Sequence, residues 1–160
     1  LELLANSEAK AIYVVDSFGS LYSEQVQYLV RKYLGYCRGA GKEVGMHAHN
    51  NLQLAFANTV EAIVLGANMV DATMAGLGRG AGNCPLELLI GFLHNPKYDL
   101  LPALRCVQNV VEPLRSKFLW GFDLPYMLTG FLNEHPRAAI KFQETKPRGD
   151  IVDFYNLIWD

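Results

Sequence analysis

Two histidines separated by a single residue are the strongest chemical signal in this sequence. His47 and His49 lie in the stretch 45–51, which reads GMHAHNN and ends an apolar segment. If residues 43–49 form a β-strand, side chains alternate between its two faces, so both imidazoles point the same way. Their ring nitrogens could then converge on one cation, because neutral imidazole is a common ligand of transition metals. The alternative is a hydrogen-bonded pair near the surface, since two ligands alone do not define a metal site.

The elements around the histidines alternate between strands and helices. Residues 11–15 (AIYVV) form an unbroken apolar run, which predicts a strand buried on both faces, as in a parallel sheet. A helix is predicted next, with Ser23 as its N-cap and an end near Gly35 or Gly39. It is followed by the strand 43–49 and by a helix 52–65 that stops at Gly66. A short strand, 68–72, and a helix beginning near Pro85 complete the pattern. This alternation is typical of an α/β protein with a parallel sheet.

The alternation stops after Pro96, and the remaining chain has mainly helical patterns. Helices are predicted over 100–114 and 124–132, and Asp150 is placed to cap a last one. We therefore divide the chain into a βα part, residues 1–96, and a helical C-terminal segment, residues 97–160. The first ten residues show no initiator Met and no signal-peptide pattern, so we expect the chain to start inside a larger fold.

The composition is that of an ordinary globular protein. Of 160 residues, 51% are hydrophobic and 19% charged, and the formal net charge is −2, which gives no sign of nucleic-acid or membrane-surface binding. No apolar run is long enough to predict a membrane span. Three widely spaced cysteines match neither a disulfide framework nor a Cys-x-x-Cys site, so a reducing cytoplasm is the expected location.

A glycine-rich turn at residues 76–83 (GLGRGAGN) follows the third predicted strand. Gly76, Gly78 and Ala81 satisfy a loose dinucleotide-binding pattern. A Rossmann unit needs another strand soon after the next helix, whereas this chain continues as helices, which disfavours that interpretation. Two interpretations remain: a loop in which backbones approach closely, or a loop at the top of a barrel whose N–H groups and Asn83 face an anionic substrate.

Further polar residues lie where the predicted strands end. Asp16 fits a position near an active site better than a helix cap, and Asp71 is either a neighbour of a ligand or a hydrogen-bonding group. Arg79 either meets a carboxylate or has no role. His94 and His135 have no motif around them. One aromatic group suits a core or an interface better than a substrate platform; it comprises Phe118, Trp120, Phe122 and Tyr126.

Taken together, three segments resemble the DRE-type TIM-barrel metallolyases, and most closely their 4-hydroxy-2-oxovalerate aldolase branch. These segments are 15–17 (VDS), 45–51, and 70–78 (VDATMAGLG) with the Gly82–Asn83 pair. The resemblance is specific over residues 11–87 and much weaker beyond. It implies the C-terminal portion of a (β/α)8 barrel, with three strands present and about five more outside this sequence.

The resemblance also implies site residues. His47 and His49 match ligands of a divalent metal, Mn²⁺ or Mg²⁺. Three further matches are expected to be catalytic: Asp16 and Ser17 at the end of the sixth barrel strand, and Tyr126, a tyrosine lying over the substrate. Asp71 matches a position on the eighth strand, and Gly78 and Asn83 match the substrate-binding loop. Three groups of the family's first strand have no counterpart here: an Asp metal ligand, an Arg that holds the pyruvyl carboxylate, and the His base of the aldolases.

The expected activity of the parent enzyme is that of a class II pyruvate aldolase, which cleaves a 4-hydroxy-2-oxoacid to pyruvate and an aldehyde. The isolated chain is expected to be inactive. The alternatives are a lyase or Claisen-type synthase acting on an acyl-CoA, and a non-catalytic partner domain. Expected partners are the 2-oxoacid substrate, the missing N-terminal half of the barrel, and either a second copy or an aldehyde dehydrogenase. Neither nucleic acid nor membrane is expected.

Overall fold

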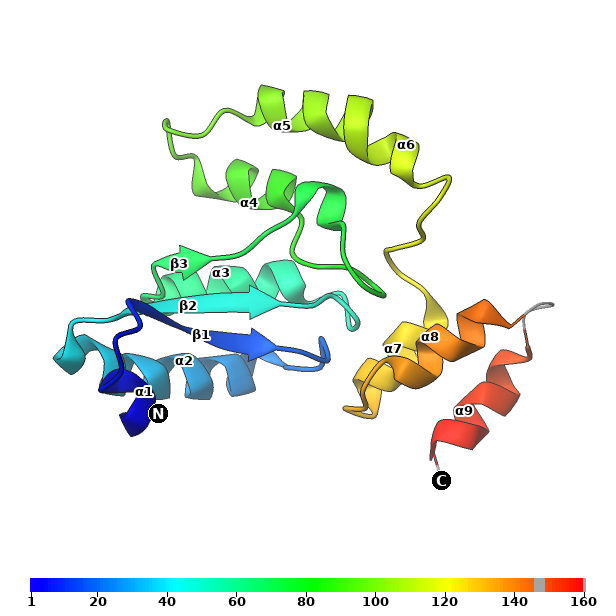
Figure 1. Cartoon of the computed structure of the whole chain (residues 1–160), viewed down its shortest axis with the longest axis horizontal. Helices are drawn as coiled ribbons and strands as arrows, with labels where there is room; N and C mark the ends of the chain where they lie inside the picture. The colour runs from blue at the N-terminus through cyan, green and yellow to red at the C-terminus, as the bar shows by residue number, and fades with distance from the viewer. Residues whose placement is uncertain (146–148, 160) are drawn as a thin grey trace.

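The protein is described by a computed structural model that covers residues 1–145 and 149–159. Strands β1 (Ala11–Asp16), β2 (Glu43–Ala48) and β3 (Met69–Val70) form one parallel sheet in the order β1-β2-β3. Their arrows point the same way in Figure 1, so the carboxyl ends of the strands lie at one edge. The expected α/β class is confirmed.

Helices cover one face of this sheet. The α-helices of the βα part are α1 (Glu2–Ala5), α2 (Ser23–Cys37), α3 (Ala55–Leu65) and α4 (Leu86–Leu93), and two short 3-10 helices are η1 (Arg38–Ala40) and η2 (Met74–Gly76). Helix α2 buries Val26, Val30 and Leu34, which recur every four residues and therefore share one side of the helix. They pack with the strands and α3 into the main core. On the opposite face of β1, Val15 remains 51% exposed. The sheet thus has one covered and one open face, as Figure 1 shows.

Three predicted boundaries in this part are wrong. Tyr22, not Ser23, is the N-cap of α2, and its N–H donates to the Gln25 side chain at 2.9 Å. Helix α3 begins at Ala55 instead of residue 52 because Gln53 has a φ of +59°, which no helix tolerates. Strand β3 is shorter than 68–72, since only two of its residues pair with β2.

The C-terminal segment is helical, as the sequence predicts. It contains α5 (Leu100–Cys106), a π-helical turn (Val107–Val111), α6 (Glu112–Leu114), α7 (Leu124–Phe131), α8 (Arg137–Glu144) and α9 (Ile151–Trp159). The Asp150 carboxylate accepts from the N–H groups of Val152 and Asp153, so the predicted cap of the last helix is confirmed. Helix α8 was not predicted, because it is short and its N-cap residue, Pro136, has no side chain that can accept a hydrogen bond.

A second core cluster joins α7–α9 to the glycine-rich turn. Its buried members are Ala81, Tyr126, Ala139 and Phe154. In Figure 1, these three helices lie beyond the carboxyl ends of the strands. The proposed division at residue 96 stays a prediction. Within residues 1–145 and 149–159, no helix has the length and apolar character needed to cross a bilayer.

The turn at residues 76–83 brings two backbone segments into close contact. Gly82 has a φ of +85°, and a Cβ placed on it would lie 2.1 Å from the Gly76 carbonyl oxygen. Both the conformation and the space therefore require glycine here. The Gly82 carbonyl oxygen accepts from the Asn50 N–H at 2.8 Å, which ties the turn to the segment that follows β2.

Replacing Gly82 with Ala is expected to lower the free energy of unfolding by about 1–3 kcal/mol, because backbone atoms cannot yield as a flexible side chain would. Urea unfolding of the complete protein, followed by circular dichroism, measures the change. Gly91→Ala is the matched control, since a Cβ on this helical glycine meets nothing within 4 Å. Equal unfolding midpoints for the Gly82→Ala variant and the wild type would contradict the steric argument.

Candidate metal site

His47 and His49 share the open face of the sheet at the carboxyl end of β2. The residues that alternate with them, Val44, Met46 and Ala48, are at most 1% exposed and point into the helix-covered core. The two ring centroids lie 5.0 Å apart, with the ring planes at 79°. The strand geometry thus places both imidazoles on one side, as expected from the single-residue spacing.

Each imidazole is held by a hydrogen bond at Nδ1. The His47 Nδ1 lies 3.0 Å from a carboxylate oxygen of Asp71, and the His49 Nδ1 lies 2.9 Å from the Asp16 carbonyl oxygen. No hydrogen bond occupies either Nε2 among the described residues. Histidines that bind metals typically use one nitrogen for the ion and donate the other N–H to a carboxylate or carbonyl. Both rings have this arrangement.

The protonation of His49 also suits a ligand. Burial lowers the pKa of His49, while the hydrogen bond to the Asp16 carbonyl opposes this effect. A lowered pKa favours the neutral ring, which is the form that binds metal ions.

Asp71 belongs to a network that the sequence did not reveal. The Tyr13 ring lies across Gly45, where an added Cβ would be 2.5 Å from the ring. Burial raises the pKa of Tyr13, and the negative charge of the nearby Asp71 raises it further. Tyr13 on β1 therefore lies near Asp71, which directly follows β3 and contacts His47. Gly45 was the available sequence signal, because a glycine inside a strand often marks close approach of another group.

Asp16 acts through two different groups. Its carboxylate is buried and accepts from the N–H groups of Ser20 and Leu21 at 3.0 and 3.1 Å, which stabilises the loop after β1. Burial raises the pKa of Asp16, and these N–H groups oppose the rise. Its carbonyl orients His49. The Ser17 carbonyl oxygen accepts from Arg79 at 3.4 Å. Catalytic roles for Asp16 and Ser17 stay predictions.

The backbone of Asn83 lies beside that of His49. It forms an isolated antiparallel bridge with His49. Its side-chain amide donates to the Leu77 carbonyl oxygen at 3.2 Å and packs against Gly78, where a Cβ would be 2.5 Å away. The amide oxygen is buried and has no hydrogen-bond partner among the described residues. An unpartnered buried acceptor calls for an explanation, and an amide oxygen on a residue bridged to His49 is of a type that can serve as a ligand of a cation.

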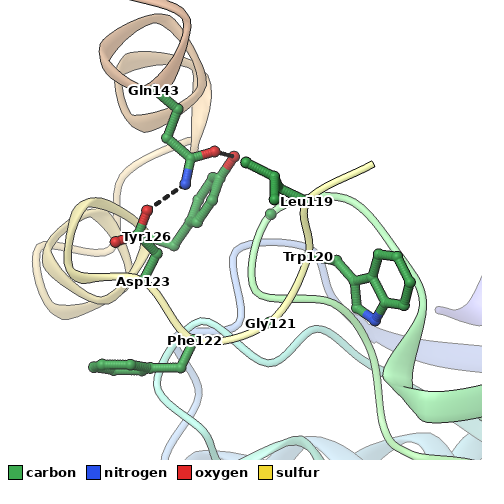
Figure 2. A pocket seen from close by; sticks show the side chains of 8 residues that line it. Leu119, Trp120, Gly121, Phe122, Asp123, Tyr126 and Gln143 are labelled. Carbon is green, nitrogen blue, oxygen red and sulfur yellow. Dashed lines mark hydrogen bonds between the residues drawn. The ribbon is translucent and has the colours of Figure 1, made fainter. Parts of the chain in front are cut away.

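Tyr126 lies in a separate small pocket of about 150 Å³. Figure 2 shows its hydroxyl facing Gln143, to which it donates at 2.8 Å, while the Gln143 amide donates to Asp123. The lining residues are Gly80, Leu119, Trp120, Gly121, Phe122, Asp123, Tyr126 and Gln143. Neither histidine lines this pocket. Its connection to the histidines is the glycine-rich turn, because Gly80 contacts the Tyr126 ring. The role of Tyr126 over a substrate stays a prediction.

Asp71→Asn is expected to weaken Mn²⁺ binding by about 10–100-fold, the usual cost of losing a carboxylate that orients a ligating histidine. Calorimetric titration of the complete protein with Mn²⁺ gives the affinity. Asp153→Asn, which removes the same charge from the exposed surface of α9, is the control. Unchanged affinity in the Asp71 variant would show that this carboxylate does not support a ligand.

Comparison with known proteins identifies the family. The family model named HMGL-like matches residues 1–110. The 4-hydroxy-2-oxovalerate aldolase of Thermus thermophilus is 41% identical over 116 residues, which are 70% of this chain and 33% of that protein. The oxaloacetate decarboxylase of Mycobacterium tuberculosis is 46% identical over 143 residues, covering 81% of this chain and 40% of that protein.

Solved structures agree with this assignment. The N-terminal domain of a candidate aldolase from Bacteroides vulgatus has a TM-score of 0.71 and 34% identity, covering 86% of this chain and 46% of that one. The HMG-CoA lyase of Bacillus subtilis, at 21% identity, shows only the shared fold, with a TM-score of 0.60 over 67% of this chain and 39% of that one. The chain spans less than half the length of each of these relatives. Because the family model covers more than half of its residues, the chain belongs to the HMGL-like family and forms part of a TIM-barrel-like domain.

Proposed function

We propose that the complete protein containing this chain is a divalent-metal-dependent pyruvate aldolase that cleaves a 4-hydroxy-2-oxoacid. The observation that carries the proposal is the hydrogen bonding of the two imidazoles, which holds both Nδ1 atoms and leaves both Nε2 atoms for a ligand. The identity to 4-hydroxy-2-oxovalerate aldolases supports the reaction type. Mn²⁺ and Mg²⁺ are the expected ions.

The described residues supply only part of such a site. Among them, no group of three or more His, Cys, Asp or Glu side chains is placed to hold a metal ion. We infer that His47 and His49 are two of the ligands and that a carboxylate from another barrel strand completes the set. A bound divalent cation supplies Lewis-acid polarisation of a keto oxygen. Asp71 and the Asp16 carbonyl keep the two imidazoles oriented for this task.

Retro-aldol cleavage requires a base that removes the C4 hydroxyl proton. The C3–C4 bond then breaks, the aldehyde leaves, and C3 takes up a proton to give pyruvate. The base is expected on the first barrel strand, outside these residues. The contribution of this chain is to hold one side of the substrate site: the histidines on the open face, and Gly78 and Asn83 in the adjoining turn.

The second candidate is decarboxylation of oxaloacetate, which the 46% identity to the mycobacterial protein favours. It breaks the corresponding C3–C4 bond and also yields pyruvate, with carbon dioxide leaving in place of the aldehyde. The same oriented imidazoles suit both reactions.

The test is to incubate the complete protein with Mn²⁺ and 4-hydroxy-2-oxovalerate, or with oxaloacetate, and to follow pyruvate with lactate dehydrogenase and NADH. Metal-dependent release of pyruvate together with acetaldehyde is the expected result. Reactions without protein measure spontaneous decarboxylation. If the protein released pyruvate from oxaloacetate but not from 4-hydroxy-2-oxovalerate, the second candidate would replace the aldolase proposal. Turnover that persists in EDTA would rule out the metal requirement.

The proposal includes a cytoplasmic location, which three free cysteines support, since Cys37 and Cys84 are buried as thiols. An aldehyde dehydrogenase partner and a homo-oligomer stay predictions.

A further inference from the structure

The glycine-rich turn carries one cationic side chain without an anionic partner. Arg79 is exposed, and among the described residues its guanidinium makes one hydrogen bond, the 3.4 Å contact with the Ser17 carbonyl oxygen. Among the described residues, the ion pair between two permanently charged side chains joins Arg115 to Glu112, and none involves Arg79. A guanidinium has five N–H donors in a planar fork that matches a carboxylate. Most of its donors therefore remain open.

Contacts with two parts of the molecule define the position of Arg79. Ser17 directly follows Asp16, whose carbonyl holds His49, so the guanidinium lies next to the segment that orients a candidate metal ligand. On the other side, Gly80 is so close to Tyr126 that a Cβ would be 2.9 Å from the ring. The turn thus places Arg79 between the histidine pair and the pocket of Tyr126.

We propose that Arg79 determines specificity by binding a second carboxylate, on the half of the substrate that leaves as the aldehyde. The inference rests on the proposed function. A 2-oxoacid can bind a cation through its keto oxygen and its C1 carboxylate together, which leaves the far end of the molecule for Arg79. The preferred substrates are then 2-oxo dicarboxylic acids, in place of 2-oxoacids with a neutral tail.

The test compares two non-cleavable ligands of equal chain length, 2-oxoglutarate and 2-oxopentanoate, by calorimetry on the complete, Mn²⁺-loaded protein. Both share the 2-oxoacid head, lack the C4 hydroxyl and differ in the terminal carboxylate. The wild type is expected to bind 2-oxoglutarate at least about tenfold more tightly, as one charge-assisted bidentate contact would give. Arg79→Gln is expected to bring this ratio to about one, and Arg79→Lys to an intermediate value.

Arg31→Gln, which removes the same charge from the exposed surface of α2, serves as the control and is expected to keep the wild-type ratio. Lack of preference in the wild type, or a preference that survives in Arg79→Gln, would overturn the inference. The binding measurement does not require turnover. The two proposals can therefore fail separately. If neither 4-hydroxy-2-oxoglutarate nor 4-hydroxy-2-oxovalerate yields pyruvate, the aldolase proposal fails. The anion site still stands in that case if 2-oxoglutarate binds more tightly than 2-oxopentanoate and the difference depends on Arg79.

Discussion

Replacing His47 and His49 together by Ala in the complete protein is expected to lower kcat/KM for pyruvate release by at least about 10³-fold. The reason is that loss of a Lewis acid removes several kcal/mol of stabilisation from the transition state, and each 1.36 kcal/mol is about tenfold in rate. Pyruvate release at saturating Mn²⁺, with calorimetric Mn²⁺ titration in parallel, measures both losses.

The double variant should still fold, because both side chains lie on the open face and neither belongs to the buried core. A small shift in the urea midpoint is therefore expected. His94→Asn is the control, since it removes an exposed imidazole at the end of α4 and Asn tolerates the positive φ of that position. If the double variant kept most of its activity and Mn²⁺ affinity, the cation would have to be held by other residues.

The isolated 160-residue chain is expected to show no aldolase turnover and to bind Mn²⁺ more than about 100-fold more weakly than the complete protein. Loss of an outer partner of a ligand already costs about 10–100-fold, so loss of a ligand itself costs more. Two imidazoles without a carboxylate also suit Mn²⁺ poorly, because it prefers oxygen ligands. The same titration and pyruvate assay, run on both proteins at equal concentration, give the comparison. Robust turnover by the isolated chain would show that residues outside it are not needed.

The strands and most helices were predictable because their patterns are local. The run at residues 11–15 and the alternation across β2 both identify strands, and alternation alone puts His47 and His49 on one face. The spacing of Val26, Val30 and Leu34 likewise identifies α2. The structure confirms these elements with small shifts at their ends, because single hydrogen bonds and φ angles determine the residue at which an element begins or ends.

The contacts around the histidines were not predictable, because they join residues far apart in the chain. The sequence left Asp71 with two interpretations, and only the pairing of β2 with β3 brings its carboxylate to His47. Gly45 signals that some group approaches β2 closely, but the sequence does not identify this group as the Tyr13 ring. From the sequence, the carboxylate of Asp16 could equally have faced the candidate metal site. It accepts hydrogen bonds from the N–H groups of the following loop because of the path that the chain takes after β1.

The hydrogen bonds that hold the two imidazoles at Nδ1 also have a consequence for the entropy of ion capture. A free histidine side chain samples several rotamers and two tautomers, and immobilising a flexible side chain on binding costs about 0.5–1.5 kcal/mol. Here Asp71 and the Asp16 carbonyl already restrict both rings before any ion arrives. The loss of ring freedom accompanies folding, so an arriving cation meets Nε2 atoms that need little rearrangement. Its association rate should then be governed by the release of its own water ligands.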